Sequence, residues 1–412
     1  MRFLALLALL VTSSAVARDL AFVGATVFPG PGSEALSDAV VRVREGRIAA
    51  VGPREGVPLP EGVEVIDCSG KFITAGFWNS HVHIFTPDLL HVRDTPVEQL
   101  ESSIEGIFTR WGFTTVFDVA SDVENTLALR ERIERGEVRG PRILTVGQPF
   151  WVKTPIYVVD YLIAHRIAIP PTTTAEEAVA RVTSLADRGV DGIKVFTGSV
   201  QGRGAVANMD VGLVRAVTAE AGRRRLPVFS HPQNAEGLEA AIEGGVNILA
   251  HTAPQSPPWT PEFVARMRQA RIALIPTLTL LRVEGERGQV PAEIVRRWTE
   301  HALEQVRAFH AGGGEILFGT DVGYIDHFDT AEEFQWLAKA GLDFPAMLES
   351  LTTAPAARFG GPGQNGRIEK GSAADLVVLA GDPRQDVTAL ARVHATVRGG
   401  KFIYRANSSR AE

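Results

Sequence analysis

The sequence predicts an α/β protein in which a (β/α)8 TIM barrel is flanked by a small β-sandwich domain built from both ends of the chain. Short apolar strands alternate with amphipathic helical segments over about 290 residues in the middle. Strand-like runs without helices stand before and after that region. We therefore expect a signal peptide at 1–17, the β-sandwich at 18–71 and 361–412, and the barrel at 72–360.

The first residues have the pattern of a cleavable signal peptide. One early arginine precedes an apolar run from Phe3 to Val11, and an Ala-Val-Ala tripeptide ends at Ala17. The run is too short to span a bilayer. We expect export to the periplasm or the medium without a membrane anchor. The alternative is an N-terminal core strand or helix.

Composition narrows the class of protein and partner. The net charge of -6 lacks the basic excess of a nucleic-acid binder, and 45% hydrophobic residues are typical of a globular protein. Cys68 is the single cysteine, so a disulfide within one chain is excluded. The expected partner is a small-molecule substrate, and a homo-oligomer is compatible with the sequence.

The predicted β domain is justified by turn-bounded strands at both ends. The runs LAFVGATVF, AVVRVREGRIAAVG and VEVIDC are separated by Gly and Pro turns and leave no room for a normal helix. AADLVVLAGDP and ATVRGGKFIY repeat the pattern near the other end. We expect these segments to pair with one another.

The barrel is predicted from its strand count. FITAGFWNSHVH is taken as the first strand, and the other seven are TTVFDVA, RILTVG, GIKVF, PVFSH, NILAH, IALIPTL and EILFGTD. Helical patterns such as AEEAVARVTSLADRG, AEGLEAAIEGG and TPEFVARMRQA lie between several of them. Eight such strands close a barrel, and its catalytic residues come from the carboxyl ends of the strands.

Polar residues stand at these strand ends. His81 and His83 flank Val82, and the two-residue strand period points both imidazoles to one side, where they can reach one metal. Taken alone, the pattern more often belongs to hydrogen-bonded strand residues than to metal ligands. His231 ends PVFSH, His251 ends NILAH and Asp321 ends EILFGTD. Imidazoles and carboxylates suit zinc or a similar divalent ion.

Lys194 interrupts the apolar strand GIKVF, where a buried parallel strand would normally carry Val or Ile. Burial lowers the pKa of a lysine and makes its neutral amine reactive. One interpretation is a lysine carboxylated by carbon dioxide, whose new carboxylate bridges two cations. The other is a lysine that extends to solvent or forms a salt bridge at the barrel mouth.

These residues, in this order, resemble the amidohydrolase superfamily, in particular its imidazolonepropionase-like and prolidase-like branch with two metals and a carboxylated lysine. The resemblance covers nearly the whole chain after the signal peptide. Its motifs are GKFITAGFWNSHVHI, GIKVF, NAEGLEAAIEGGVNILAHT, LFGTDVG and the tail GRIEKGSAADLVVLAGDP.

The resemblance implies a ligand set. His81, His83 and Asp321 would hold the more buried metal, His231 and His251 the more exposed one, and Lys194 would bridge them. Members of the family commonly carry aspartate two residues before the first histidine, where this chain has Asn79. Asn79 lacks the carboxylate that would orient a ligand there.

The mechanism expected from such a site is hydrolysis of a C–N amide bond by a hydroxide that bridges the two metals. Asp321 would accept the proton of the attacking water and pass it to the leaving nitrogen. A dipeptide or an N-acyl amino acid is the favoured substrate. A cyclic amide, or an ester, lactone or phosphotriester, is the alternative, and a ligand-binding barrel is the non-enzymatic one.

Candidate substrate-binding residues lie in the loops after the strands. The segment QPFWVKTPIYVVDY supplies Trp151, Lys153 and Tyr157, which could bind an aromatic or carboxylate-bearing group. The segment could instead be a packed lid or a subunit contact. Arg203 could hold a carboxylate or could be a solvated loop residue.

Overall fold

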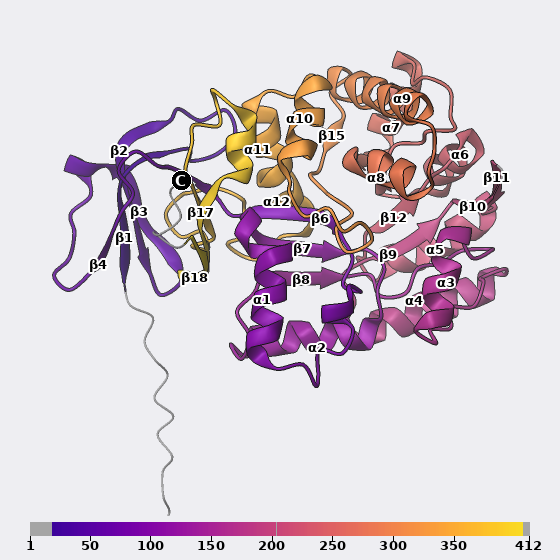
Figure 1. The fold of residues 1–412 in the computed structure, drawn as a ribbon, viewed down its shortest axis with the longest axis horizontal. Coiled ribbons are helices and arrows are strands. Elements are labelled where there is room, and N and C mark those ends of the chain that lie inside the picture. Colours follow the sequence, from indigo (N-terminus) through magenta and orange to yellow (C-terminus); the bar gives the residue numbers. More distant parts are fainter. Residues whose placement is uncertain (1–18, 203, 407–412) are drawn as a thin grey trace, which may run out of the picture.

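The computed structural model describes residues 19–202 and 204–406. The predicted signal peptide and Arg203 lie outside the described residues. Figure 1 shows a β-sheet part on the left, to which both ends of the described chain contribute, and a larger α/β part on the right. Within the described ranges, every helix is too short or too polar to cross a membrane.

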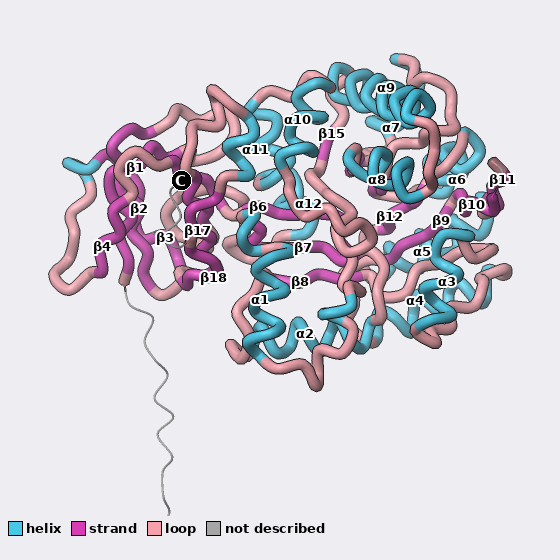
Figure 2. Tube along the Cα trace, in the orientation of Figure 1, coloured by secondary structure: helices cyan, strands magenta, loops and turns pink. Residues whose placement is uncertain are grey.

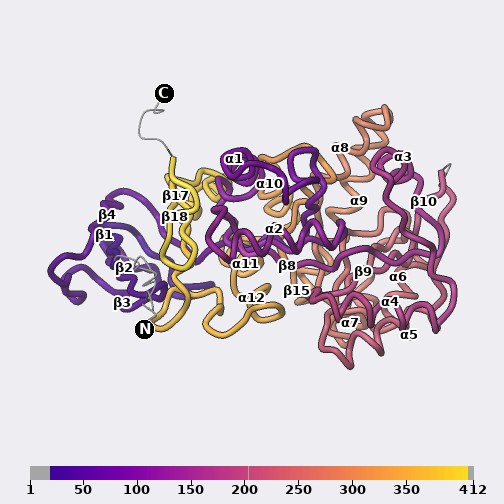
Figure 3. The backbone as a smooth tube through the Cα atoms, turned by 90° about the horizontal axis from the view of Figure 1, so that it is seen from below, coloured from indigo at the N-terminus to yellow at the C-terminus, as the bar shows by residue number. Residues whose placement is uncertain are grey.

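The two ends of the chain join in one eight-stranded sheet, as the sequence predicts. The strands run in the order β18-β17-β16-β5-β1-β2-β3, and β4 pairs with β1. In Figure 3 the C-terminal strands β17 and β18 lie between β1 to β4 and the α/β part. The bounds are β1 (Leu20–Val27), β2 (Leu36–Arg44), β3 (Arg47–Pro53), β4 (Glu64–Asp67), β5 (Phe72–Ala75), β16 (Leu376–Leu379), β17 (Val393–Arg398) and β18 (Lys401–Arg405).

The sheet curls upon itself. Three strands separate β1 from β18, so Phe22 and Phe402 would lie roughly 19 Å apart in a flat sheet. Their ring centroids are 6.0 Å apart instead. Distant strands therefore share one apolar core, and the form of two separate sandwich layers stays a prediction.

The first predicted barrel strand is divided between the two parts of the molecule, which corrects its assignment as one strand. β5 pairs with β1 and β16 of the small sheet, whereas β6 (Phe77–Val82) pairs with β7 (Phe113–Asp118) of the barrel. Gly76 stands between β5 and β6, and a Cβ there would meet Thr114 Oγ1. The continuous extended run FITAGFWNSHVH does not reveal this division, because both halves are equally apolar.

The α/β part is a TIM-barrel-like fold with eight parallel strands in two hydrogen-bonded groups, β6-β7-β8 and β9-β12-β13-β14-β15. Phe150 N donates to Lys194 O at 2.8 Å and joins the end of β8 to β9. Ser80 N donates to Phe318 O at 2.8 Å and joins β6 to the segment after β15. The bounds of the other six strands are β8 (Arg142–Thr145), β9 (Ile193–Phe196), β12 (Val228–His231), β13 (Ile248–Ala250), β14 (Ala273–Ile275) and β15 (Glu315–Ile316).

Helices surround these strands (Figure 2), and six of those described, α2, α4, α5, α6, α7 and α11, begin with a side chain that accepts a hydrogen bond from a free backbone N–H group. Thr174 and Glu177 form a capping box at the start of α4, and Asn234 caps α6. A hairpin of β10 (Gly198–Gly202) and β11 (Ala205–Asn208) follows β9. The helices are α1 (Val97–Ile107), α2 (Val123–Glu134), α3 (Ile156–Ala164), α4 (Ala175–Asp187), α5 (Val211–Arg223), α6 (Ala235–Gly244), α7 (Pro261–Gln269), α8 (Thr279–Arg287), α9 (Ala292–Ala311), α10 (Ala331–Lys339), α11 (Phe344–Leu351) and α12 (Thr353–Phe359).

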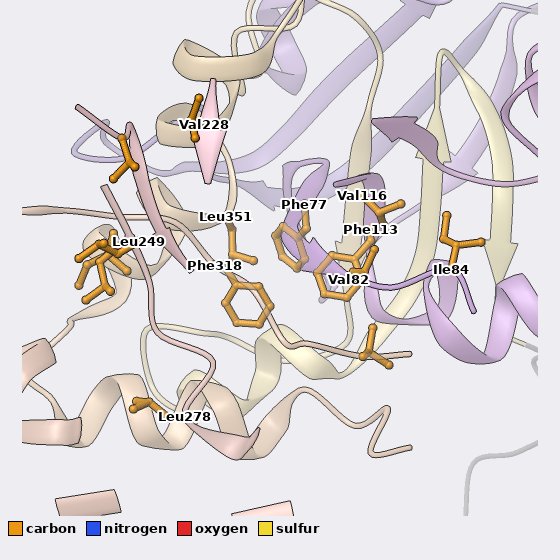
Figure 4. Packing of buried hydrophobic residues seen from close by; sticks show 14 of the residues in the cluster. Phe77, Val82, Ile84, Phe113, Val116, Val228, Leu249, Leu278, Phe318 and Leu351 are labelled. Atoms are coloured by element: carbon orange, nitrogen blue, oxygen red, sulfur yellow. The ribbon is translucent and has the colours of Figure 1, made fainter. Parts of the chain in front are cut away.

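Apolar side chains pack on both sides of the barrel strands. Phe113 and Phe318, whose ring centroids are 5.9 Å apart, belong to the large cluster drawn in Figure 4. Ile193 and Val195 of β9 belong to that cluster as well. Phe229 of β12 belongs to a second, smaller cluster with Phe117. Because strand side chains alternate, Lys194 points away from the face that Ile193 and Val195 occupy.

Candidate metal centre

Five of the six predicted ligands lie at or just beyond the carboxyl ends of barrel strands, Lys194 lies within β9, and all six line one cavity. His81 lies on β6 and His83 follows it directly, while Lys194 lies on β9 and His231 ends β12. His251 follows β13, and the last of the six, Asp321, comes five residues after β15. The parallel strands therefore bring together residues that are far apart in the sequence.

Asp321 lies at the middle of the cluster. Its Oδ1 is 3.2 Å from His81 Nε2 and 2.8 Å from His83 Nε2, and its Oδ2 is 4.0 Å from His251 Nε2. Ligand atoms of His81, His251 and Asp321 all lie within 4.8 Å of one another. The His231 ring lies 4.7 Å from the His251 ring, which places a fourth imidazole beside this group.

The chemistry of this donor set fits divalent ions. Both ring nitrogens of His81 and Oδ1 of Asp321 are buried, and the short distances between these imidazoles and the carboxylate do not have hydrogen-bond geometry, which is costly unless another group binds there. Burial lowers the pKa of His81 to about 3, although Asp321 partly opposes this. Burial likewise holds the pKa of His231 and His251 well below the ordinary value, so these imidazoles are neutral, as metal ligands must be.

Two of the imidazoles are oriented by hydrogen bonds from their other nitrogen. His83 Nδ1 lies 2.9 Å from the carbonyl oxygen of Ala120, and His251 Nδ1 lies 2.6 Å from Thr277 Oγ1. Such bonds fix the ring and leave Nε2 directed at the centre. In both residues Nε2 is the atom nearest to Asp321.

Lys194 is 1% exposed, which argues against a side chain that extends to solvent. Among the described residues, no carboxylate forms an ion pair with it within 4.0 Å, so the salt-bridge alternative has no partner there. Burial lowers the pKa of Lys194 to about 7, partly opposed by Asp321. A large fraction of its amine is therefore neutral at neutral pH.

Strained backbone surrounds the centre. His251 has φ 86°, Asp321 has φ 62° and Thr277 has φ 48°, in the left-handed region that non-glycine residues rarely adopt. Gly323 has φ 99°, and a Cβ on it would lie 1.9 Å from the carbonyl oxygen of His83. Such strain persists only where surrounding contacts enforce it, and it often marks functional sites.

The Asn79 side chain forms hydrogen bonds with backbone N–H groups and a hydroxyl rather than with an imidazole. Its Nδ2 donates to Thr320 Oγ1 at 2.7 Å, and its Oδ1 accepts from His81 N at 3.3 Å and from Thr320 N at 3.2 Å. Asn79 is completely buried. It therefore links the segments that carry His81 and Asp321, a role for which an amide, with both donor and acceptor, is suited.

The four candidate substrate residues are placed differently. Trp151 and Tyr157 line the cavity, which has a volume of about 570 Å³, and the Tyr157 hydroxyl lies 3.5 Å from His231 Nε2. Lys153 is exposed and is not among the residues that line this cavity. Arg203 lies outside the described residues.

Other polar residues near the site were missed by the sequence analysis. Tyr324 and Glu284 line the cavity, and burial raises the pKa of the Glu284 carboxyl. Arg287 lies 3.1 Å from Glu284, and its guanidinium stands 5.0 Å from the Tyr324 ring centre. Asp118 on β7 accepts from Thr145 Oγ1 at 2.7 Å. Of these residues, only Asp118 could have been found from the sequence, because it is a polar residue at the end of an apolar strand.

Comparison with known proteins adds the family to this geometry. A model of the amidohydrolase family matches residues 72–403. Among solved structures, a candidate prolidase from Bifidobacterium longum aligns with a TM-score of 0.81 and 24% identity, over 96% of this chain and 97% of that one. A Xaa-Pro dipeptidase with bound methionine aligns with a TM-score of 0.79 and 21% identity, over 94% of this chain and all of that one. At these identities the likeness shows the fold alone.

The curated relatives match over shorter parts of their length. An imidazolonepropionase from Rhizobium rhizogenes is 38% identical over 65 residues, which are 15% of this chain and 16% of that protein. An adenine deaminase from Rubrobacter xylanophilus is 25% identical over 378 residues, which are 90% of this chain and 54% of that protein. Each alignment therefore spans well under two thirds of the relative.

Proposed function

We propose that this chain is a metal-dependent enzyme which cleaves the amide bond of a dipeptide or an N-acyl amino acid. The premise is that the chain belongs to the amidohydrolase family of hydrolases that act on carbon–nitrogen bonds. The observation that carries the proposal is the convergence of four imidazoles, Asp321 and a buried lysine at one cavity. Similarity in fold to a Xaa-Pro dipeptidase supports the choice of substrate class.

The residues of the chain would divide the work as follows. His81, His83 and Asp321 would hold one divalent ion, His231 and His251 a second, and Lys194 would lie between them. Two such ions, for which zinc suits the ligands, would lower the pKa of a water molecule towards neutrality and polarise the scissile carbonyl.

Asp321 is the proposed base and acid. Burial raises the pKa of its carboxyl, but His81 and His83 outweigh this and hold the pKa well below the ordinary value. The carboxylate is therefore ionised and able to accept a proton from the attacking water. It would then donate that proton to the leaving nitrogen, which must be protonated for the C–N bond to break.

Carboxylation of Lys194 Nζ by carbon dioxide is part of the proposal. The burial of Lys194 and its pKa of about 7 support it, because only the neutral amine attacks carbon dioxide. The new C–N bond forms with loss of one amine proton to solvent. The resulting carboxylate would remove the cost of a buried cation beside neutral imidazoles.

Export is proposed from residues 1–17, and it favours peptide-like substrates, which an exported enzyme encounters. N-terminal sequencing of the protein secreted by a bacterial host tests this step. A mature chain that begins at Arg18 is expected, and a chain that retains Met1 in the cytoplasm would contradict it.

The experiment that tests the function combines metal analysis with a substrate screen. Protein reconstituted with zinc is expected to hold about two ions per chain and to hydrolyse dipeptides or N-acyl amino acids. Hydrolysis of lactams alone would favour the cyclic-amide alternative. The local sequence identity to an imidazolonepropionase supports that alternative. Absence of bound metal after reconstitution would support a ligand-binding barrel instead.

A further inference from the structure

We infer that the substrate of this site carries a large apolar group, which binds against one side of the cavity beside His83. This inference rests on the proposed function, since it specifies one part of the amide substrate. We call this side the α3 wall, and its residues are Phe85, Val158, Tyr161, Leu162, Ile167 and Ile169.

The α3 wall begins at the metal centre and continues outward. The Phe85 ring centroid lies 5.0 Å from that of His83, and the Tyr161 ring lies 4.8 Å from Phe85. α3 packs against β10, which holds the helix beside the cavity. An apolar group attached near the scissile bond can therefore contact aromatic and aliphatic side chains directly beside the proposed metal ligands.

Further apolar side chains line the same cavity from α8 and α9. Leu280 and Leu281 come from α8, and Trp298 comes from α9. The cavity volume of about 570 Å³ lies within the range of sites that bury most of a drug-sized ligand. A short dipeptide of small residues would leave much of this apolar surface in contact with water, which is unfavourable.

The charged groups of the cavity argue against an anionic group on the part of the substrate that binds at the α3 wall. Apart from the proposed ligands, the acidic and basic side chains that line the cavity are Asp122, Glu284, Arg287 and Asp326, and the imidazole of His165 lines it as well. Arg287 is paired with Glu284 at 3.1 Å, and Asp122 accepts from Asn125 N at 2.9 Å as the N-cap of α2. Carboxylates thus outnumber the arginine among the described lining residues, so a neutral apolar group fits better.

α3 itself offers a matched pair of residues for a test. Leu162 lines the cavity, whereas its neighbour Ile163 is 71% exposed and does not line it. The two residues have the same volume and lie on the same helix. Leu162→Ser and Ile163→Ser therefore make the same chemical change on the two sides of α3.

The test uses two series of substrates with the zinc-reconstituted enzyme. One series lengthens the acyl group of an N-acylglycine from acetyl to hexanoyl and decanoyl. The other keeps an acetyl group and enlarges the amino acid from glycine to leucine and phenylalanine. We expect kcat/KM to rise by about fourfold per buried methylene in at least one series, and the series that responds identifies the side of the amide that meets the wall.

The two α3 variants and a binding measurement test the contact between the substrate and the α3 wall. Leu162→Ser is expected to lower kcat/KM for the largest responding substrate by on the order of tenfold, and Ile163→Ser to leave it within about twofold. Flat kcat/KM in both series, with hydrolysis of the acetyl compounds, would overturn the inference and leave the proposed function intact.

Hydrolysis of none of the compounds would contradict the proposed function, and binding then decides the inference separately. Calorimetry with decanoate and acetate is the probe. Tighter binding of decanoate that weakens in Leu162→Ser but not in Ile163→Ser supports the apolar wall. Equal binding of the two acids, or equal effects of the two variants, would refute it.

Discussion

Replacement of Gly323 by alanine tests whether the loop after Asp321 sets the geometry of the candidate metal centre. Gly323 has φ 99°, and its added Cβ would lie 1.9 Å from the carbonyl oxygen of His83. Gly323 N donates to Ile325 O at 3.1 Å, and His83 N donates to Val322 O at 2.8 Å. The loop is therefore tied to the segment that carries His83.

The size of the effect follows from the clash. Contacts of real Cβ atoms are essentially never shorter than 3.0 Å, so the added Cβ and the His83 carbonyl must separate by about 1 Å. Metal ligands tolerate deviations of about 0.2 Å, and a 1 Å misplacement near catalytic groups costs about 100-fold in rate. We expect kcat/KM of Gly323→Ala to fall by about that factor, with weaker metal binding.

Gly341→Ala is the matched control. Gly341 has φ 102°, nearly the same strain, but its Cβ would meet no atom within 4 Å. Both variants should lose about 1–2 kcal/mol of the free energy of unfolding in urea from left-handed backbone, the clash should add a further loss in Gly323→Ala, and only Gly323→Ala should lose metal and activity. Equal metal content and activity in the two variants would refute the reasoning.

The remaining predictions concern the ligands, the metals and one buried acid. Asp321→Asn is expected to keep the fold and much of the metal but to lower kcat by about 10² to 10⁴, and a fully active variant would contradict its assignment as base. Lys194→Met should reduce the metal content below two ions per chain, measured by atomic absorption; two ions and full activity would exclude a bridging role. A chelator should lower Tm and zinc restore it, since zinc at a hundred times its Kd stabilises the fold by about 2.7 kcal/mol, and an unchanged Tm would argue against a resident metal. Burial raises the pKa of Glu333 to about 7 from an ordinary value of 4.5, although Thr279 and Leu278 oppose this with hydrogen bonds. The folded state then binds more protons than the unfolded state between these pH values, so the free energy of unfolding should fall as pH rises from about 4.5 to about 7. Glu333→Gln should flatten that slope in urea titrations at several pH values, and an unaltered slope would contradict the assignment.

The barrel could be predicted because each of its strands is a short apolar run with its own local signal. GIKVF and PVFSH became β9 and β12 almost at the predicted residues. FITAGFWNSHVH was wrong as a single strand, because an extended apolar run carries no information about which sheet it joins. The close approach of Gly76 to Thr114 marks the division, and that contact belongs to the folded molecule.

The ligands could be proposed because a charged or imidazole side chain at the end of an apolar strand is conspicuous in the sequence. Tyr324 and Glu284 could not be proposed in this way, because Tyr324 lies in a loop and Glu284 on an amphipathic helix, where polar residues are ordinary. The same lack of local signal made Lys153 look equal to Trp151 and Tyr157, although only the last two line the cavity.

The sequence by itself determined the periodic features of this protein: the strands and helices, the face of Lys194 on its strand, and the chemical types of the six residues at the strand ends. Only the tertiary structure decided what those residues meet. Asn79 and Thr320 are 241 positions apart and bond at 2.7 Å, and the α3 wall forms because the chain returns beside Phe85. Periodicity is a property of neighbouring residues, whereas ligand geometry and cavity lining depend on contacts between distant segments, which no local pattern encodes.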